Sequence, residues 1–206
     1  MPKKPKPGHP AQSSYFDGID FHNGVNAVLD QMAALYQADE IPWVIGYSGG
    51  KDSTAVLQLV WLMLARFDPD QITKDVHVIT TDTLVENPIV AAWVEKSLDR
   101  LGTAAEREDV PIFPHRLTPD IKNTFWVNLI GRGYPAPRPK FRWCTERLKI
   151  QPANAFVKAV VKEHGEAIMV LGTRKAESAA RASEPMGTES SSARWPWCAA
   201  RRTGVR

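Results

Sequence analysis

A short glycine loop, set between an apolar run and a helical pattern, constrains the fold of this chain more than any other feature. The loop is Ser-Gly-Gly-Lys-Asp-Ser at positions 48–53, after the apolar run 43–47 and before apolar residues at helical spacing over 54–67. Two adjacent glycines permit positive φ angles and let a ligand approach the backbone closely. The first N–H groups of the following helix and its positive dipole end then face an anion. The order strand, loop, helix therefore predicts a phosphate-binding turn.

Six consecutive residues are expected to contact the phosphates: Ser48, Gly49, Gly50, Lys51, Asp52 and Ser53. The loop is not of the Walker A type, because no glycine lies five positions before Gly50 and because Asp52 separates Lys51 from Ser53. The structural alternative is an ordinary glycine turn before an amphipathic helix. Asp52 has a further alternative, since an acidic residue in the first turn of a helix is favourable without any ligand.

Strand-like and helix-like patterns alternate along the chain. Apolar runs predict strands over residues 43–47, 76–80, 112–117 and 167–172. Helical spacing predicts helices over 24–39, 54–67, 89–109 with a weak point at Gly102, 119–133 and 152–164, and prolines force an extended loop over 134–139. Such alternation predicts an α/β fold: a doubly wound, mainly parallel sheet with helices on both faces.

Polar clusters follow three of the predicted strands, where ligands of parallel sheets gather. After the second strand, the Asp82 carboxylate can hold the Mg²⁺ that accompanies ATP phosphates, and Thr81 can meet the nucleotide. The alternative for Asp82 is a helix or turn cap.

The cluster after the fourth strand holds a glycine and several charged residues. Gly172 would allow a nucleotide to approach closely, Arg174 and Arg181 can grip phosphate, and Glu177 can orient one of the arginines. Taken alone, this cluster is a weak signal.

Three cations, Arg142, Arg147 and Lys149, surround Cys144 in the sequence. Nearby cations favour a thiolate, which is both a nucleophile and a soft metal ligand, so Cys144 is a candidate reactive centre. The alternatives are a small buried apolar residue for Cys144 and solvated helix-start charges for Arg147 and Lys149.

Between positions 116 and 149 the chain carries eight basic and two acidic residues, interleaved with aromatic side chains. Polyanion-binding and nucleic-acid-binding surfaces use this mixture, and Arg138, Lys140 and Arg142 are its centre. A solvated loop with buried aromatic residues is the alternative.

The overall composition is less informative than these segments. The net charge of +3 equals the contribution of three lysines in a Pro-rich tail, residues 1–14, which we expect to be disordered. No segment resembles a signal peptide or a membrane span, and two cysteines cannot form a disulfide framework, so a cytoplasmic protein without a membrane partner is expected. We expect one nucleotide-binding domain over residues 15–182 and a divergent, disordered tail over 183–206.

The motifs together resemble the PP-loop ATP pyrophosphatases, and within them the phosphoadenylylsulfate reductase superfamily. They are Ser-Gly-Gly-Lys-Asp-Ser at 48–53, Thr-Asp-Thr at 81–83, Cys-Thr-Glu-Arg-Leu-Lys-Ile-Gln-Pro at 144–152 and Gly-Thr-Arg-Lys-Ala-Glu-Ser-Ala-Ala-Arg at 172–181. Residues 81–88, 123–131 and 135–144 look like the DndC-type sulfurtransferase of DNA phosphorothioation. The resemblance runs from about residue 24 to residue 182.

The resemblance implies a function. An enzyme of this type would activate a DNA backbone phosphate by adenylylation with ATP and Mg²⁺, release pyrophosphate, and replace a non-bridging oxygen by sulfur. It would carry a [4Fe-4S] cluster and work with DNA, a cysteine desulfurase and the other Dnd proteins. The expected catalytic residues are Lys51, Asp52, Asp82 and Cys144, and Cys144 alone matches a cluster position.

The expected ligand contacts divide into two sets. The nucleotide is expected to contact the glycine loop and Thr81, Asp82, Gly172 and Arg174. The substrate is expected to contact Arg138, Lys140, Arg142, Arg147, Lys149, Glu177 and Arg181.

Two other functions stay open. Family members of the DndC type continue well beyond this length and supply further cluster cysteines, so we expect a truncated form that cannot install sulfur in DNA by itself. One alternative is an enzyme like phosphoadenylylsulfate reductase or the small subunit of ATP sulfurylase. The other is a remnant that binds nucleotide or partner proteins without catalysis.

Overall fold

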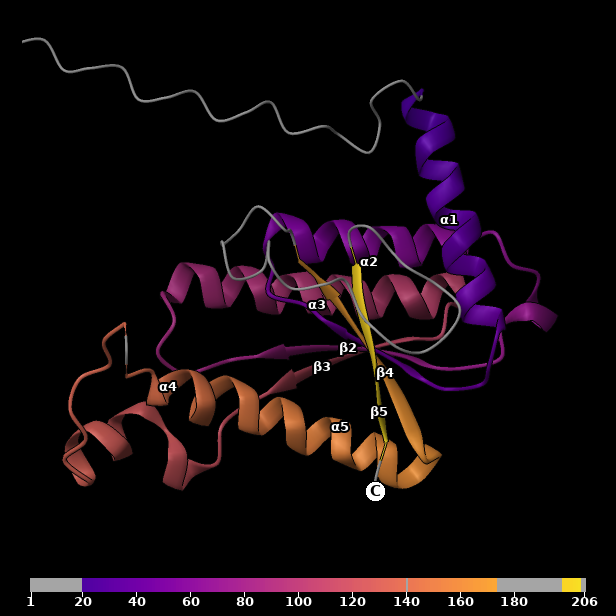
Figure 1. The fold of residues 1–206 in the computed structure, drawn as a ribbon. Coiled ribbons are helices and arrows are strands. Elements are labelled where there is room, and N and C mark those ends of the chain that lie inside the picture. Colours follow the sequence, from indigo (N-terminus) through magenta and orange to yellow (C-terminus); the bar gives the residue numbers. More distant parts are fainter. Residues whose placement is uncertain (1–19, 140, 174–197, 205–206) are drawn as a thin grey trace, which may run out of the picture.

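The computed structural model describes residues 20–139, 141–173 and, for the backbone, 198–204 (Figure 1). Its centre is a five-stranded sheet with the order β3-β2-β1-β4-β5. Four strands are parallel: β1 (Trp43–Gly46), β2 (Val76–Thr81), β3 (Ile112–Leu117) and β4 (Glu166–Gly172). The predicted mainly parallel α/β sheet is confirmed.

Helices cover both faces of the sheet, as predicted. Helices α1 (Phe21–Gln37), α2 (Lys51–Leu64) and α3 (Pro88–Glu108) pack on one face, and α5 (Gln151–His164) packs on the other (Figure 1). The alternation of side chains along β1 builds both cores, since Ile45 joins the α1–α3 core and Val44 joins the α5 core. A short 3₁₀ helix, η1 (Pro69–Gln71), leads towards β2.

The predicted weak point in the third helix is wrong, because α3 runs unbroken through Gly102. Its start is fixed by Asn87, whose side chain accepts a hydrogen bond from Ile89 N–H, with Pro88 in the first turn. A Cβ on Gly102 would lie 3.4 Å from Pro114 of β3, so this glycine lies at the contact between helix and strand. The helix ends at Asp109, which adopts a left-handed conformation with φ of 51°.

The predicted helix over 119–133 is also wrong. The segment folds as a 3₁₀ turn, η2 (Ile121–Asn123), and a π-helix, η3 (Val127–Gly131). The chain then passes through α4 (Trp143–Thr145) and a second π-helix, η4 (Glu146–Ile150), which leads directly into α5. We call residues 119–139 and 141–150 the aromatic lobe.

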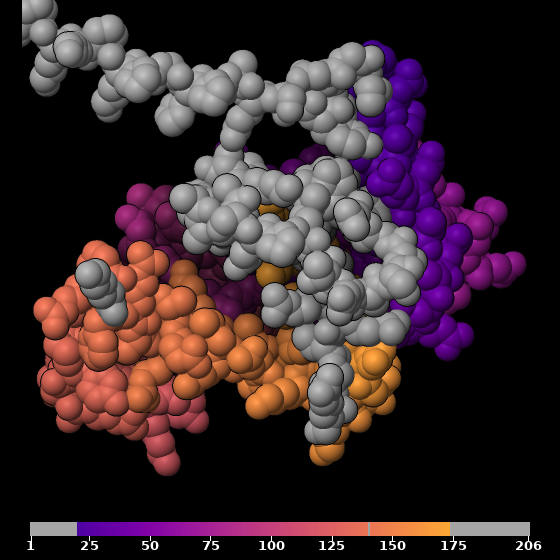
Figure 2. Space-filling model, viewed as in Figure 1, coloured from indigo at the N-terminus to yellow at the C-terminus, as the bar shows by residue number. Residues whose placement is uncertain are grey.

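Aromatic packing explains this departure from helical geometry. Trp143 is buried, stacks on Phe125 with ring centroids 5.4 Å apart, and meets Tyr134 edge-on. Its indole Nε1 donates a hydrogen bond of 2.9 Å to the carbonyl of Pro135. The lobe therefore has a small core of its own. It lies beyond the end of the sheet towards which β2 and β3 point (Figure 1), and it projects at the lower left of the space-filling view (Figure 2).

Residues 198–204 differ from the expected disordered tail. They form β5 (Cys198–Gly204), which pairs antiparallel with β4 from Glu166↔Gly204 to Gly172↔Cys198. Pairing at a sheet edge uses backbone N–H and C=O groups, so it needs no apolar alternation in the added strand. The predicted tail 1–14 and residues 183–197 lie outside the described residues, as do the boundaries of the predicted domain.

No helix among the described residues is both long enough and apolar enough to span a membrane.

Candidate functional site

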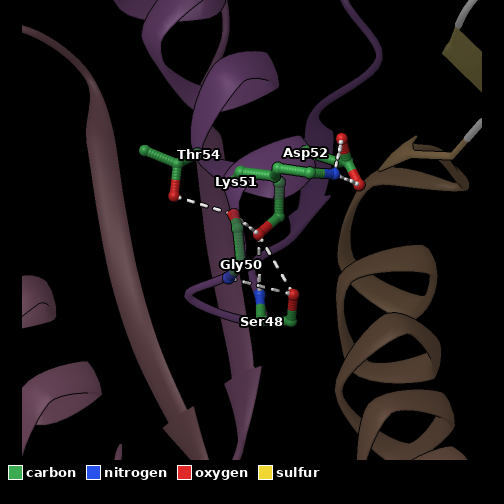
Figure 3. A network of polar contacts seen from close by, with 6 residues as sticks. Ser48, Gly50, Lys51, Asp52 and Thr54 are labelled. Atoms are coloured by element: carbon green, nitrogen blue, oxygen red, sulfur yellow. Dashed lines mark hydrogen bonds and ion pairs between the residues drawn. The ribbon is translucent and has the colours of Figure 1, made fainter.

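The glycine loop connects β1 to α2 as the sequence predicts (Figure 3). Gly49 has a φ of +71°, and a Cβ at this position would lie 2.6 Å from the Trp93 ring, so glycine is required both for the backbone and for the space. Gly50 caps α2 without any side-chain hydrogen bond to the helix N-terminus. The first turn of α2 thus keeps its backbone donors directed at the end of the loop.

Side-chain hydroxyls hold the loop in shape. Ser53 is buried, accepts a hydrogen bond of 3.2 Å from Ser48 N–H, and donates one of 3.0 Å to the carbonyl of Gly50. Thr54 donates to the same carbonyl at 2.9 Å. The Nζ of Lys51 lies 3.0 Å from both carboxylate oxygens of Asp52 (Figure 3). The loop is preformed in a geometry that suits an anion.

Strand β4 abuts the start of α2 at Gly172. A Cβ on Gly172 would lie 2.6 Å from the carbonyl oxygen of Asp52 and 3.1 Å from the nitrogen of Ser53. Both are backbone atoms that cannot turn aside, so only glycine fits. The predicted importance of Gly172 has this packing reason, whether or not a nucleotide also approaches it.

A pocket of about 600 Å³ opens where β1 and β4 end, the point at which the strand order reverses. The predicted residues that it brings together are Ser48, Ser53, Thr81, Asp82, Lys149 and Gly172. Gly49 and Lys51 instead line a second hollow of about 630 Å³ on the other side of the loop, with Trp93 and Arg100. We call the first of these hollows the main pocket. The sequence predicted six of its residues, but it did not predict that Gly49 and Lys51 would line the second hollow instead.

Asp82 lines the same pocket directly after the end of β2, and we call its side of the pocket, with Glu95 and Arg116, the facing wall. Its Oδ2 accepts a hydrogen bond of 2.5 Å from Arg116, and its Oδ1 accepts one of 2.8 Å from Leu84 N–H. Burial opposes ionisation of this carboxyl, but the hydrogen bonds from Arg116 and Leu84 and the charge of Arg116 outweigh it and lower its pKa. Asp82 is thus a carboxylate at neutral pH, and such an oxygen suits Mg²⁺.

The turn after Asp82 also matches the predicted structural alternative. Leu84 has a φ of 61°, and the hydrogen bond from its N–H to Asp82 stabilises this conformation. Two residues on, Glu86 accepts a hydrogen bond of 3.2 Å from Thr83 and pairs with Lys149 of η4 at 3.2 Å. Asp82 therefore both shapes the turn and faces the pocket.

Cys144 is half-buried in α4 and does not line the pocket. Two of the cations expected around it have other partners: Arg147 donates to Asn123 at 2.9 Å and to Tyr134 at 2.8 Å, and Lys149 pairs with Glu86. Within residues 20–139 and 141–173, no three His, Cys, Asp or Glu side chains gather as a metal site. This part of the chain does not fit an iron–sulfur cluster held within one chain.

Four predicted residues, Lys140, Arg174, Glu177 and Arg181, lie outside the described residues. Arg138 and Arg142 are exposed on the aromatic lobe, away from the pocket lining.

Sequence reasoning missed Arg116 and Glu95 as pocket residues, and it included Glu86 only as the last residue of the polar cluster after the second strand. Arg116 was visible only as one charge of the basic segment, although its place at the end of a predicted strand was a usable signal.

Sequence comparison agrees with this arrangement of strand, loop and pocket. A model of the phosphoadenosine phosphosulfate reductase domain matches residues 42–194. The chain belongs to this family. An uncharacterized protein of Methanocaldococcus jannaschii, MJ0066, is 27% identical over 149 residues, which cover 72% of this chain and 26% of that protein. The chain thus spans about a quarter of the length of the curated relative that it matches, and its α/β fold is consistent with that of the family.

Proposed function

We propose that this protein binds ATP with magnesium in the main pocket and cleaves the bond between the α and β phosphates. One observation carries the proposal: the glycine loop, through Ser48 and Ser53, and the ionised Asp82 line one pocket at the carboxyl ends of parallel strands. ATP is the substrate here. Backbone donors at the start of α2 would hold its phosphates, and the Asp82 carboxylate would hold Mg²⁺, which neutralises phosphate charge.

At a finer level, we propose that the chain is the nucleotide-activating part of an ATP-dependent sulfurtransferase for DNA phosphorothioation. The resemblance of residues 81–88, 123–131 and 135–144 to the DndC type supports this assignment. The aromatic lobe supports it independently, because it exposes the aromatic side chains Trp126 and Phe141 and the cations Arg138 and Arg142, and the backbone of Phe141 pairs with that of Arg138. Stacking surfaces next to cations suit nucleic acid.

The proposed reaction follows from leaving-group chemistry. A non-bridging oxygen of a DNA phosphate attacks the α-phosphorus of ATP, and the bond to pyrophosphate breaks. The activated DNA phosphorus then accepts a sulfur nucleophile, and AMP leaves with the former phosphate oxygen. The described residues bear on the first step only. The proposed sulfur supply involves a cysteine desulfurase, the other Dnd proteins and a [4Fe-4S] cluster, and no step is assigned to that cluster here.

The nucleotide step is tested with purified protein, ATP and Mg²⁺. Calorimetry should show ATP binding that falls about tenfold in Lys149→Ala, because Lys149 lines the main pocket and a charged hydrogen bond to phosphate contributes about 1.5 kcal/mol or more. Lys96→Ala, an equivalent change on an exposed part of α3, is the matched control. Turnover should release pyrophosphate and AMP. ADP and orthophosphate as products would contradict cleavage between the α and β phosphates.

The DNA assignment is tested by fluorescence anisotropy with a short duplex. The double variant Arg138→Ala/Arg142→Ala should bind DNA more weakly and with a smaller salt dependence, because fewer counterions are released. Lys158→Ala/Lys162→Ala removes the same charge from the exposed side of α5 and should have little effect. Equal losses in both double variants would reduce the DNA interaction to a general charge effect.

The family match favours one other candidate, an enzyme that acts on sulfate nucleotides. Sulfite release from phosphoadenosine phosphosulfate in the presence of a thiol reductant would select it over DNA modification. ATP binding without any turnover would instead indicate a non-catalytic nucleotide-binding protein.

A further inference from the structure

The guanidinium of Arg116 bridges two carboxylates on the pocket wall opposite the glycine loop. Its Nη2 donates to Asp82 Oδ2 at 2.5 Å, and its Nη1 donates to Glu95 Oε1 at 2.5 Å. Each carboxylate receives one hydrogen bond from a separate nitrogen, whereas an arginine can give two parallel hydrogen bonds to a single carboxylate or phosphate. Arg116 could therefore bind one phosphate through two parallel hydrogen bonds, which would be stronger than the single hydrogen bonds that it gives to each carboxylate.

The charges on this wall are unevenly balanced for an anionic ligand. Among the described residues, three carboxylates line the pocket, from Asp82, Glu86 and Glu95, against the two cations Arg116 and Lys149. Both cations are ion-paired with these carboxylates. A polyphosphate that enters would meet surplus negative charge unless a cation changes partner.

Arg116 is well placed to change partner. Its side chain is 42% exposed while that of Asp82 is only 13% exposed, so the arginine reaches in from solvent over a fixed carboxylate. Solvent-exposed ion pairs contribute little net free energy, because water and salt compete for both charges. The Arg116 backbone is fixed by pairing of β3 with Thr80 of β2, so only the side chain has to move.

We propose that Arg116 is an exchange residue: when a polyphosphate binds, its guanidinium leaves Asp82 and Glu95 for phosphate oxygens. The Asp82 carboxylate, and with it Glu95, then becomes available to a divalent cation. The inference rests on the proposed function for the identity of the ligand, a nucleoside polyphosphate with Mg²⁺. It assigns to Arg116 a role that neither the family match nor the loop motif indicates.

If Arg116 exchanges partners, Arg116→Gln should raise the affinity for a divalent cation and lower the affinity for pyrophosphate. Each affinity is measured in the absence of the other ligand. Manganese binding to the nucleotide-free protein, followed by electron paramagnetic resonance of free Mn²⁺, should become about fivefold tighter or more, because the carboxylates lose their cation. Binding of inorganic pyrophosphate in the presence of a chelator, followed by calorimetry, should weaken about tenfold. A merely structural Arg116 would lower both affinities or change neither, and either result would overturn the proposal.

Two further variants sharpen the test. Glu95→Gln removes one of the two partners that hold Arg116, so pyrophosphate should bind a few-fold tighter, and unchanged or weaker binding would count against exchange. Arg107→Gln makes the same chemical change in the last turn of α3, outside both hollows, and should alter neither affinity. Arg116→Lys keeps the positive charge on a single ammonium group, and it replaces Arg116→Gln in these measurements if that variant unfolds. Its affinity for pyrophosphate should fall less than that of Arg116→Gln.

The manganese measurement also separates this inference from the proposed function. It uses no nucleotide, so a gain in Mn²⁺ affinity in Arg116→Gln supports the masking of Asp82 even if ATP cleavage is not observed. Equal Mn²⁺ affinity in the parent and Arg116→Gln overturns exchange even if ATP is cleaved.

Discussion

The two walls of the pocket are built in different ways. The loop wall belongs to one short segment, residues 48–54, of which Ser48 and Ser53 line the pocket, and its side-chain hydrogen bonds join groups at most five positions apart. On the facing wall, the partners of Arg116 lie 34 and 21 positions away in the chain, and they are joined by ion pairs that water can reach. The first wall is a local backbone structure, and the second is an assembly of charges from separate elements.

This difference predicts how each wall responds to change. Backbone contacts and buried hydroxyls leave no room for rearrangement, so alterations of the loop wall should cost folding stability as well as binding. Exposed ion pairs can exchange partners at little cost, so alterations of the facing wall should act mainly on ligand binding and salt dependence. The four predictions below test this contrast, from the largest expected effect to the smallest.

Gly172→Ala should produce the largest decrease in the free energy of unfolding. The added methyl group would overlap backbone atoms of Asp52 and Ser53, and overpacking against atoms that cannot move costs about 1–3 kcal/mol. Urea denaturation should show this decrease in the free energy of unfolding, and ATP affinity should fall with it. Gly46→Ala is the control, because its Cβ would meet only the Cδ2 end of Leu171, which can turn away. Equal losses in the two variants would contradict the rigid contact.

Ser53→Ala should lower the free energy of unfolding by about 1–2 kcal/mol, since it leaves Ser48 N–H without its buried hydroxyl acceptor. Thr54→Val keeps the side-chain shape and removes only one hydrogen bond, to the Gly50 carbonyl, which also accepts one from Ser53. It should therefore lower the free energy of unfolding by less. Both changes are measured by urea denaturation. A larger loss in Thr54→Val than in Ser53→Ala would show that the loop is not held from within by Ser53.

The same contrast explains what the sequence could reveal. The loop was predictable because a glycine turn between strand and helix needs neighbouring residues in a fixed order, such as Gly49 for its positive φ. The internal hydrogen bonds of Ser53 were not predicted, because the sequence favoured a contact of its hydroxyl with an anion. The strands were predictable from their apolar runs, and the carboxyl-end position of Asp82 followed from the parallel sheet. The partnership of Asp82 with Arg116 was not predictable, because it depends on the pairing of β2 with β3 and on side-chain reach.

The aromatic lobe was mispredicted for a related reason. Helical spacing over 119–133 suggested one amphipathic helix, but Phe125 is drawn into a stack on Trp143, which lies on another element. Tertiary packing therefore overrode the local pattern and left a 3₁₀ turn and a π-helix in place of an α-helix. The prediction that Arg147 acts on Cys144 also overlooked tertiary contacts, since Arg147 donates hydrogen bonds to Tyr134 and Asn123.

The strands beneath the facing wall carry a pH-sensitive pair. The Nδ1 of His77 lies 3.2 Å from the Nε2 of His115, and both rings pack on Phe156. Burial lowers the pKa of each imidazole below 6.5, and the neighbouring imidazole lowers that of His115 further. Because the unfolded chain binds these protons more readily, the free energy of unfolding should fall as the pH drops from about 6.5 towards the folded-state pKa values.

Chemical denaturation at pH 7.5 and pH 5 should show this modest loss in the parent and a smaller one in His77→Phe/His115→Phe. His22→Gln, at an exposed position near the start of α1, is the control and should retain the parental pH dependence. If the double variant loses as much stability on acidification as the parent, groups other than His77 and His115 cause the acid sensitivity.

The smallest effect is expected for the ion pair between Lys149 and Glu86. Its atoms lie 3.2 Å apart with side chains 56% and 40% exposed, and pairs of this kind contribute about 0.2–1 kcal/mol at low salt. A double-mutant cycle with Lys149→Ala, Glu86→Ala and both should give a coupling free energy in the lower half of that range. The coupling should fade in about 1 M salt, where the screening length is only about 3 Å. A salt-independent coupling well above 1 kcal/mol would mean that this wall is held as firmly as the loop wall, and it would remove the physical basis for partner exchange by Arg116.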